Sequence, residues 1–137
     1  MTTGNVREVA VQWAGGLRFD GRAEGRPAVR VDGDGREALS PVELLLVAAG
    51  ACTGADVVGI LEKQRVTLRA LEITVTGTRR EEHPRRYTAL HLRFAIRGEG
   101  ADQTKARRAI DLSLEKYCSV VATLAPDLRV TYDVALA

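Results

Sequence analysis

Polar and apolar residues alternate along the first part of the chain, the pattern of half-buried β-strands. Two such runs, over residues 9–13 and 17–19, are separated by an alanine and two glycines at 14–16. This arrangement predicts a β-hairpin. A third strand is expected over 28–32, because the glycine-containing cluster at 33–35 tolerates the backbone conformation of a tight turn.

A helix is predicted next, because the period of the pattern changes at Ser40–Glu43. The serine suits an N-cap, the following proline the first helical position, and the glutamate a capping box. The helix is expected to reach about Arg65. Its stretch Leu44–Ala55 is apolar on every face apart from Thr53, which indicates burial all round. A monomer of 137 residues can hardly surround such a helix, so we expect a dimer.

The rest of the chain returns to alternation, interrupted by one more helix. Strands are predicted over Leu68–Thr78 and Tyr87–Arg97, joined by a charged loop, and a last strand over Leu128–Leu136. A second helix is expected from near Asp102 to just before Pro126. The order β-β-β-α-β-β-α-β predicts one α+β domain over the whole chain.

The second helix is expected to bury one apolar face. Its members at helical spacing are Ala106, Ile110, Leu114, Tyr117, Cys118, Val121 and Leu124. Cys118 is therefore expected to point into the interior. On the strand before it, alternation places His91 on the outward face.

Composition adds few constraints. With 20 Lys and Arg against 18 Asp and Glu, the net charge is +2, too small to indicate a nucleic-acid or membrane partner. The longest apolar run, 44–52, is well short of the roughly 20 residues that cross a bilayer. The first ten residues lack the features of a secretory signal, so we predict a cytoplasmic protein.

Cys52 and Cys118 are the candidate reactive residues. They lack the spacing of a zinc or thioredoxin-type site, and His83 and His91 do not complete one, so neither a metal nor a cofactor is expected. Cysteine is often an inert core residue, and this interpretation stays open for each thiol. Two thiols on the interior faces of two helices also suit a pair in which one attacks an oxidant and the other resolves the product.

Three segments carry a resemblance that spans nearly the whole chain. They are SPVELLLVAAGACTGADVVGILEK around Cys52, LEKYCSVVATL around Cys118, and VQWAGGLRFDG near the start. Together they resemble the OsmC/Ohr family of thiol-dependent peroxidases. Within the family, the ELLL segment and the YCSV context are most similar to the YhfA-like branch.

The resemblance implies an intertwined homodimer, with two long helices packed centrally against antiparallel sheets and active sites at the subunit interface. It implies that Cys52 is the peroxidatic cysteine, which becomes a sulfenic acid, and that Cys118 is the resolving cysteine, which closes an intrasubunit disulfide. A dithiol donor would reduce that disulfide. In the hydroperoxide-resistance branch of the family the donor is a lipoylated protein.

The family also uses an Arg to hold the peroxidatic thiol as thiolate and a Glu to orient that Arg. Val42 occupies the position of the Glu in this chain. Glu43 lies roughly 180° around the helix from Cys52 and is better explained as a capping residue. Asp56 shares the face of Cys52, where it either clamps an Arg or is a buried polar residue bonded elsewhere.

Arg18 is the expected Arg, because it follows a Gly-Gly pair as in the family, with Leu17 inserted; Arg22 and Arg30 are alternatives. An ordinary thiol has a pKa of about 8.5 and is only a few per cent ionised at neutral pH. Cys52 lies on the order of 16 Å past the helix start, too far for the helix dipole to help. A nonlocal cation is therefore required.

These observations predict a homodimeric thiol peroxidase that acts on organic hydroperoxides through Cys52 and Cys118. The alternative is a non-enzymatic dimer of the same family that senses redox state or binds a small ligand, which the missing Glu favours. A Cys-His hydrolase is a weaker third interpretation, since neither histidine is expected on the Cys52 side of the core.

Overall fold

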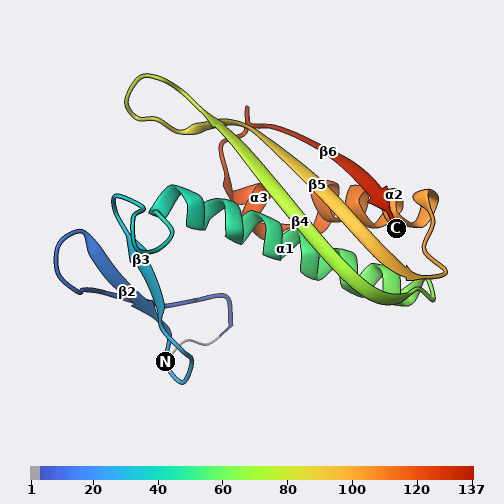
Figure 1. Cartoon of the computed structure of the whole chain (residues 1–137), viewed down its shortest axis with the longest axis horizontal. Coiled ribbons are helices and arrows are strands. Elements are labelled where there is room, and N and C mark those ends of the chain that lie inside the picture. The colour runs from blue at the N-terminus through green and yellow to red at the C-terminus, as the bar shows by residue number, and fades with distance from the viewer. Residues whose placement is uncertain (1–3) are drawn as a thin grey trace. The chain divides into compact units, whose positions relative to one another are not determined.

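The structure, a computed structural model, describes residues 4–137. Residues 1–3, which begin the stretch expected to lack a secretory signal, lie outside it. The chain forms two compact units, divided between Leu45 and Leu46 (Figure 1). We call them the N-terminal unit and the C-terminal unit and describe each by itself.

The N-terminal unit is a three-stranded antiparallel sheet. Its strands are β1 (Ala10–Trp13), β2 (Arg18–Arg22) and β3 (Val29–Asp32), in that spatial order. The β1–β2 turn contains Gly15 and Gly16 with φ of 96° and 56°, a conformation that favours glycine. The predicted hairpin and third strand are therefore confirmed.

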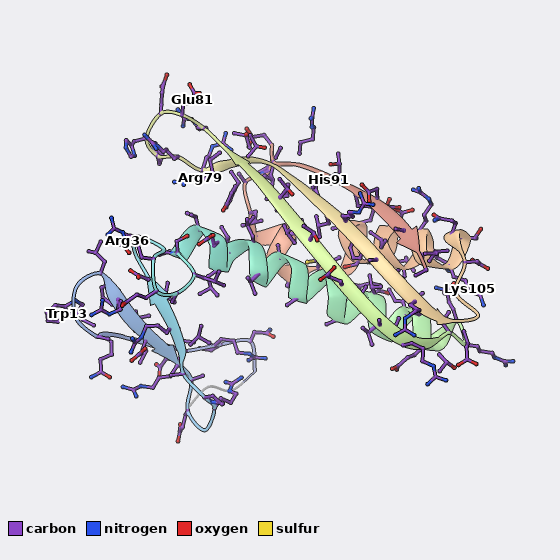
Figure 2. All side chains as sticks on the ribbon, viewed as in Figure 1. Trp13, Arg36, Arg79, Glu81, His91 and Lys105 are labelled. Atoms are coloured by element: carbon purple, nitrogen blue, oxygen red, sulfur yellow. The ribbon has the colours of Figure 1, made fainter. Side chains whose placement is uncertain are left out.

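This unit has no apolar core of its own. Among residues 4–45 only the polar residue Asp32 is buried. Trp13 is 66% exposed on β1 (Figure 2), and Val11 and Val29 line a shallow apolar groove of about 400 Å³. A small sheet needs its apolar face covered to be stable, so this face requires a partner surface.

The first helix, α1 (Pro41–Lys63), begins as the sequence predicts. The Glu43 side chain accepts a hydrogen bond from the Ser40 backbone N–H at 2.9 Å, and the Ser40 hydroxyl accepts one from the Glu43 N–H at 3.2 Å. The Ser40 N–H holds the pKa of the Glu43 carboxyl below its usual value. The capping box is confirmed, and it occupies Glu43 at the helix start.

The C-terminal unit packs its helices against one face of a second sheet (Figure 1). The long strands β4 (Thr67–Arg79) and β5 (Tyr87–Glu99) are antiparallel, whereas β6 (Arg129–Leu136) runs parallel to β5. This sheet is therefore mixed rather than wholly antiparallel, because the helical segment between β5 and β6 is a crossover connection. The predicted α+β class and order of main elements are confirmed.

Helix α1 lies close to β4 because two of its residues have no side chain. A Cβ added at Gly50 would meet Val75 at 2.9 Å, and one at Gly54 would meet Ile73 at 2.8 Å. A neighbouring face of the helix stays open: Val47 is 49% exposed, and Ala51 and Ala55 are exposed as well. Within one chain α1 is thus buried along one face only, and covering the rest requires another surface.

Helix α1 also has the length and composition of a membrane span. It is 23 residues long and predominantly apolar. Core helices of soluble proteins share this property, and the close packing of Gly50 and Gly54 on β4 is that of a core helix.

The second helical region is not the continuous helix that the sequence predicts. It consists of α2 (Gln103–Leu112), a π-helical turn η1 (Ser113–Tyr117) and a short α3 (Ser119–Thr123). Cys118 separates the last two with an extended backbone, at φ −73° and ψ 100°. Its N–H donates to the Ser113 carbonyl at 2.8 Å, which closes the wider turn.

The interruption changes which side chains face inward. Tyr117, predicted on the apolar face, is 51% exposed, so this prediction is wrong. A π-helical turn has more residues than an α-helical turn and shifts the phase of those that follow. Cys118 is only 4% exposed, which confirms its predicted interior position.

Candidate active site

The two cysteines belong to facing segments of the C-terminal unit. Cys52 is half-buried in the middle of α1, and Cys118 is buried at the break before α3. The Cys118 sulfur accepts a hydrogen bond from the Thr53 hydroxyl at 3.4 Å and one from the Val121 backbone N–H at 3.5 Å. Because Thr53 is the next residue after Cys52, this contact joins the two segments directly beside both thiols.

The surroundings of Cys118 favour its neutral form. Burial is the main cause that raises the pKa of the Cys118 thiol, and the nearby Cys52 raises it further. The hydrogen bonds from Thr53 and Val121 oppose this rise without cancelling it. Cys118 is therefore a protonated thiol at neutral pH, and Cys52 is the more accessible of the two.

Asp56 makes the second side-chain link between these segments. Its carboxylate accepts a hydrogen bond from the buried Ser113 hydroxyl at 2.8 Å. No arginine within residues 4–137 forms an ion pair with it. Asp56 is therefore bonded to Ser113, and whether it also clamps an arginine of the N-terminal unit stays a prediction.

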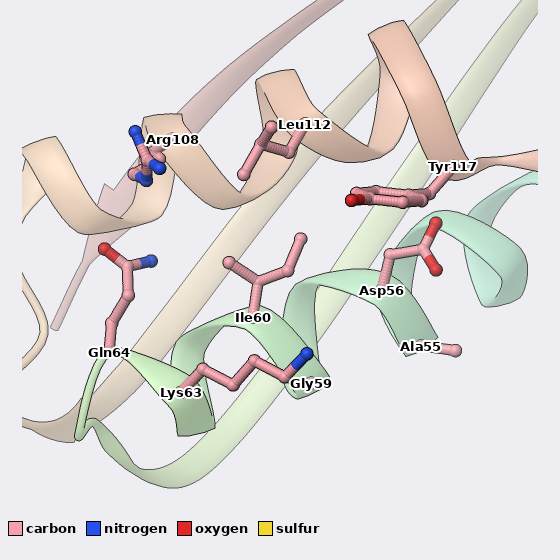
Figure 3. Close-up of a pocket in the computed structure, with 9 residues that line it drawn as sticks. All are labelled: Ala55, Asp56, Gly59, Ile60, Lys63, Gln64, Arg108, Leu112 and Tyr117. Atoms are coloured by element: carbon pink, nitrogen blue, oxygen red, sulfur yellow. The ribbon is translucent and has the colours of Figure 1, made fainter.

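A groove of about 480 Å³ begins one turn beyond Cys52, between α1 and the α2–η1 segment (Figure 3). The Tyr117 ring lies over Asp56 at one end, and Arg108 lies at the other, above Gln64. Lys63 also lines the groove. Neither it nor Arg108 has an ion-pair partner in the described part of the chain. The groove thus combines apolar walls with two unpaired cations.

Arg18 is held in the N-terminal unit by a carboxylate. Its guanidinium forms an ion pair with Glu37 at 2.8 Å. It lies against the turn that precedes it, where a Cβ added at Gly15 or Gly16 would be 3.4 or 3.5 Å from a guanidinium nitrogen. Those distances are ordinary van der Waals contacts, so the positive φ of the two residues, rather than the guanidinium, accounts for the glycines.

The position of Glu37 depends on a turn organised by Asp32. The buried Asp32 carboxylate accepts hydrogen bonds from the backbone N–H groups of Glu37 at 3.0 Å and Asp34 at 3.3 Å. These bonds, that of Glu37 foremost, hold the pKa of Asp32 below its usual value. Sequence reasoning missed Glu37, although the Asp-Gly-Asp-Gly run before it is a recognisable signal for an ordered turn.

The alternative arginines are engaged elsewhere. Arg30 forms a bidentate pair with Asp20, at 2.5 and 3.1 Å, and Arg22 hydrogen-bonds Gln12. A carboxylate orients both Arg18 and Arg30, and it is the Gly-Gly motif of the sequence that favours Arg18. Arg18 belongs to the N-terminal unit and Cys52 to the C-terminal unit, and their proximity stays a prediction.

Neither histidine lies near the thiols. His91 is on the outward face of the second sheet (Figure 2), where Nδ1 contacts the Thr131 hydroxyl at 2.7 Å and Nε2 contacts Asp133 at 2.9 Å. Helix α1, which carries Cys52, packs on the opposite face. His83 lies in the loop between β4 and β5. Neither histidine is therefore placed to act as the general base for Cys52, as a Cys-His hydrolase requires.

Comparison with known proteins identifies the family of this chain. The family model described as "OsmC-like protein" matches residues 33–133, which include both cysteines. Protein YhfA of Escherichia coli K12 is 40% identical over 127 residues, which cover 92% of this chain and 95% of the relative. The chain belongs to the OsmC-like family.

Two solved structures agree with the fold. A hypothetical protein from Aquifex aeolicus superimposes with a TM-score of 0.85 at 31% identity, covering 98% of this chain and 99% of the other. The organic hydroperoxide resistance protein OhrB of Bacillus subtilis gives a TM-score of 0.61 at 15% identity, covering 94% and 98%. The second likeness is one of fold alone, and it shows that this fold includes hydroperoxide-resistance proteins.

Proposed function

We propose that this OsmC-like protein is a thiol-dependent peroxidase that reduces organic hydroperoxides. The observation that carries the proposal is the pairing of an accessible thiol, Cys52, with a buried and protonated thiol, Cys118, on facing segments. A peroxidatic cysteine must meet the oxidant, whereas a resolving cysteine must be kept from it until the first step is complete. The different access of the two thiols matches that division.

The proposed reaction has three steps: oxidation of Cys52, formation of the disulfide, and its reduction. The Cys52 thiolate attacks the peroxide, so that a sulfur–oxygen bond forms, the oxygen–oxygen bond breaks, and the alcohol leaves with a proton. The Cys118 thiol then attacks the Cys52 sulfenic acid, which forms the disulfide and releases water. A dithiol donor reduces the disulfide and is oxidised itself. By likeness to the hydroperoxide-resistance branch, the donor is a lipoylated protein in the cytoplasm.

The cation that activates Cys52 is Arg18 in this proposal. Its ion pair with Glu37 supplies the orienting carboxylate that is missing where Val42 stands. A guanidinium next to the thiol would stabilise the thiolate form of Cys52. This assignment makes Arg18 catalytic and Glu37 a positioning residue.

We also propose that the working form is a homodimer. Two apolar surfaces support it: the N-terminal sheet lacks a core of its own, and the Val47 side of α1 is open. A second copy covers both without any other partner, and the resemblance places active sites at that interface. Sedimentation at micromolar concentration is expected to show a dimer, and Val11→Asp is expected to weaken it. A folded wild-type monomer at that concentration would rule the proposal out.

The direct test of function is peroxide consumption by the purified protein. With cumene hydroperoxide and dihydrolipoamide, we expect turnover that depends on both reagents, measured by loss of peroxide. Absence of consumption with either dihydrolipoamide or dithiothreitol would contradict the peroxidase. It would favour the second candidate function, binding of a small ligand, for which the groove with Lys63 and Arg108 is the supporting observation.

A further inference from the structure

Thr53 is a fully buried hydroxyl in an otherwise apolar part of α1. Burying a hydroxyl in an apolar environment is unfavourable unless it is hydrogen-bonded. Its side-chain partner in the structure is the Cys118 sulfur, at 3.4 Å. A valine would fill the same space without that cost, so the hydroxyl indicates a role at the sulfur.

Cys118 has an environment that restrains its own reactivity. It is 4% exposed, and burial disfavours the thiolate that must form when it attacks another sulfur. Its sulfur accepts two hydrogen bonds, from Thr53 and from the N–H of Val121 in the first turn of α3. Hydrogen bonds to a charged form stabilise that form, so these donors counteract burial as negative charge develops.

The Thr53 bond also fixes where the sulfur points. Cys118 is at a break in the helix, with π-helical η1 before it and the five-residue α3 after it. One turn away, the hydrogen bond from the Ser113 hydroxyl to the Asp56 carboxylate joins the same two segments. Because Thr53 follows Cys52 directly in α1, its hydrogen bond holds the Cys118 side chain next to the Cys52 position.

From this geometry we infer that Thr53 is a positioning residue for disulfide closure, whose hydroxyl directs the Cys118 sulfur toward Cys52 and stabilises its negative charge during attack. The roles of the two cysteines rest on the proposed function. The closure reaction itself does not require a peroxide, because any reagent that gives Cys52 a sulfur-bound leaving group starts it.

Dithiobis(nitrobenzoate) separates closure from peroxidase activity. The Cys52 thiolate attacks its disulfide and releases one thionitrobenzoate, which leaves Cys52 in a mixed disulfide. Cys118 then attacks the Cys52 sulfur, so that the Cys52–Cys118 bond forms, the second thionitrobenzoate leaves with the electron pair, and the Cys118 proton goes to solvent. The visible absorbance of the product follows both phases. Cys118→Ser is expected to give the first phase alone.

Thr53→Val is expected to slow the second phase about tenfold at neutral pH, the size expected for loss of one hydrogen bond to a charged group. It is also expected to shift the pH midpoint of that phase upward, since the pKa of Cys118 rises when a donor is lost. Thr53→Ser keeps the hydroxyl and is expected to restore both the rate and the midpoint. Thr76→Val, on the outward face of β4 where it pairs with His91, is the matched control.

A second measurement covers the case in which Thr53→Val perturbs folding. In a Cys52→Ser background, the rate of Cys118 alkylation against pH reports its pKa, and Thr53→Val and Thr53→Ser are compared there. An unchanged second phase and pKa in Thr53→Val, or equal slowing by Thr53→Ser, would overturn the inference. Failure of the peroxide assay with normal two-phase closure would contradict the proposed function and leave the role of Thr53 intact.

Discussion

Cys52→Ser is expected to abolish the consumption of organic hydroperoxide, with a rate at least about a hundredfold below that of the wild type. The remaining thiol, Cys118, is buried and its pKa is raised, so it offers little thiolate to the oxidant. Cys118→Ser is expected to keep the first step and to stop at a sulfenic acid on Cys52, because no thiol resolves it. Trapping of that sulfenic acid by dimedone, read by mass spectrometry, distinguishes the two variants.

The wild type supplies the matched comparison in the same experiment. One equivalent of hydroperoxide is expected to give a Cys52–Cys118 disulfide and no trapped sulfenic acid. Equal consumption by both single variants would contradict the assignment of roles, since it would mean that neither thiol is preferred. A dimedone adduct on Cys118 in place of Cys52 would reverse the assignment.

The strands and the start of α1 were predictable because local rules determine them. The capping box of Ser40 and Glu43 uses atoms three residues apart, and it forms as the sequence predicts. The break at Cys118 was not predictable in the same way. The apolar spacing runs through it without a proline or glycine, so no local signal marks the π-helical turn.

The residues of the candidate site were likewise predictable only where local sequence determines them. Both cysteines are visible in their sequence motifs, and the buried position of Cys118 follows from helical spacing, whereas Cys52 is half-buried. Thr53 was apparent only as the one polar residue in an apolar stretch, because its partner lies 65 residues away. Glu37 was missed because its pairing with Arg18 depends on the turn that Asp32 folds, a tertiary feature with no periodic signature.

Loss of the Arg18 charge is expected to have the second largest effect on the proposed reaction. At neutral pH a thiol with the ordinary pKa of about 8.5 is only a few per cent ionised, so losing the activating cation should slow Cys52 oxidation about ten- to a hundredfold. Arg18→Gln is expected to move the pH midpoint of that step upward, because the thiolate loses the cation that stabilises it. Stopped-flow oxidation by cumene hydroperoxide across pH measures both effects.

Glu37→Gln tests whether the orienting carboxylate matters separately from the charge. Arg18 remains in this variant but loses its ion pair, so we expect a smaller loss, on the order of threefold to tenfold, with a smaller upward shift of the midpoint. In the double variant the two losses are not expected to add, because Glu37 acts only through Arg18. Additive losses would show instead that Glu37 acts independently.

Arg30→Gln is the matched control for Arg18→Gln. It removes the same charge from the same sheet, but that guanidinium is engaged by Asp20 across the β2–β3 pair. Its oxidation rate and pH midpoint are expected to stay near those of the wild type. Equal losses in Arg30→Gln and Arg18→Gln would show that Cys52 responds to the overall charge of the N-terminal sheet rather than to one oriented guanidinium. An unchanged pH midpoint in Arg18→Gln would remove Arg18 from the site, and the cation would then have to be a different residue.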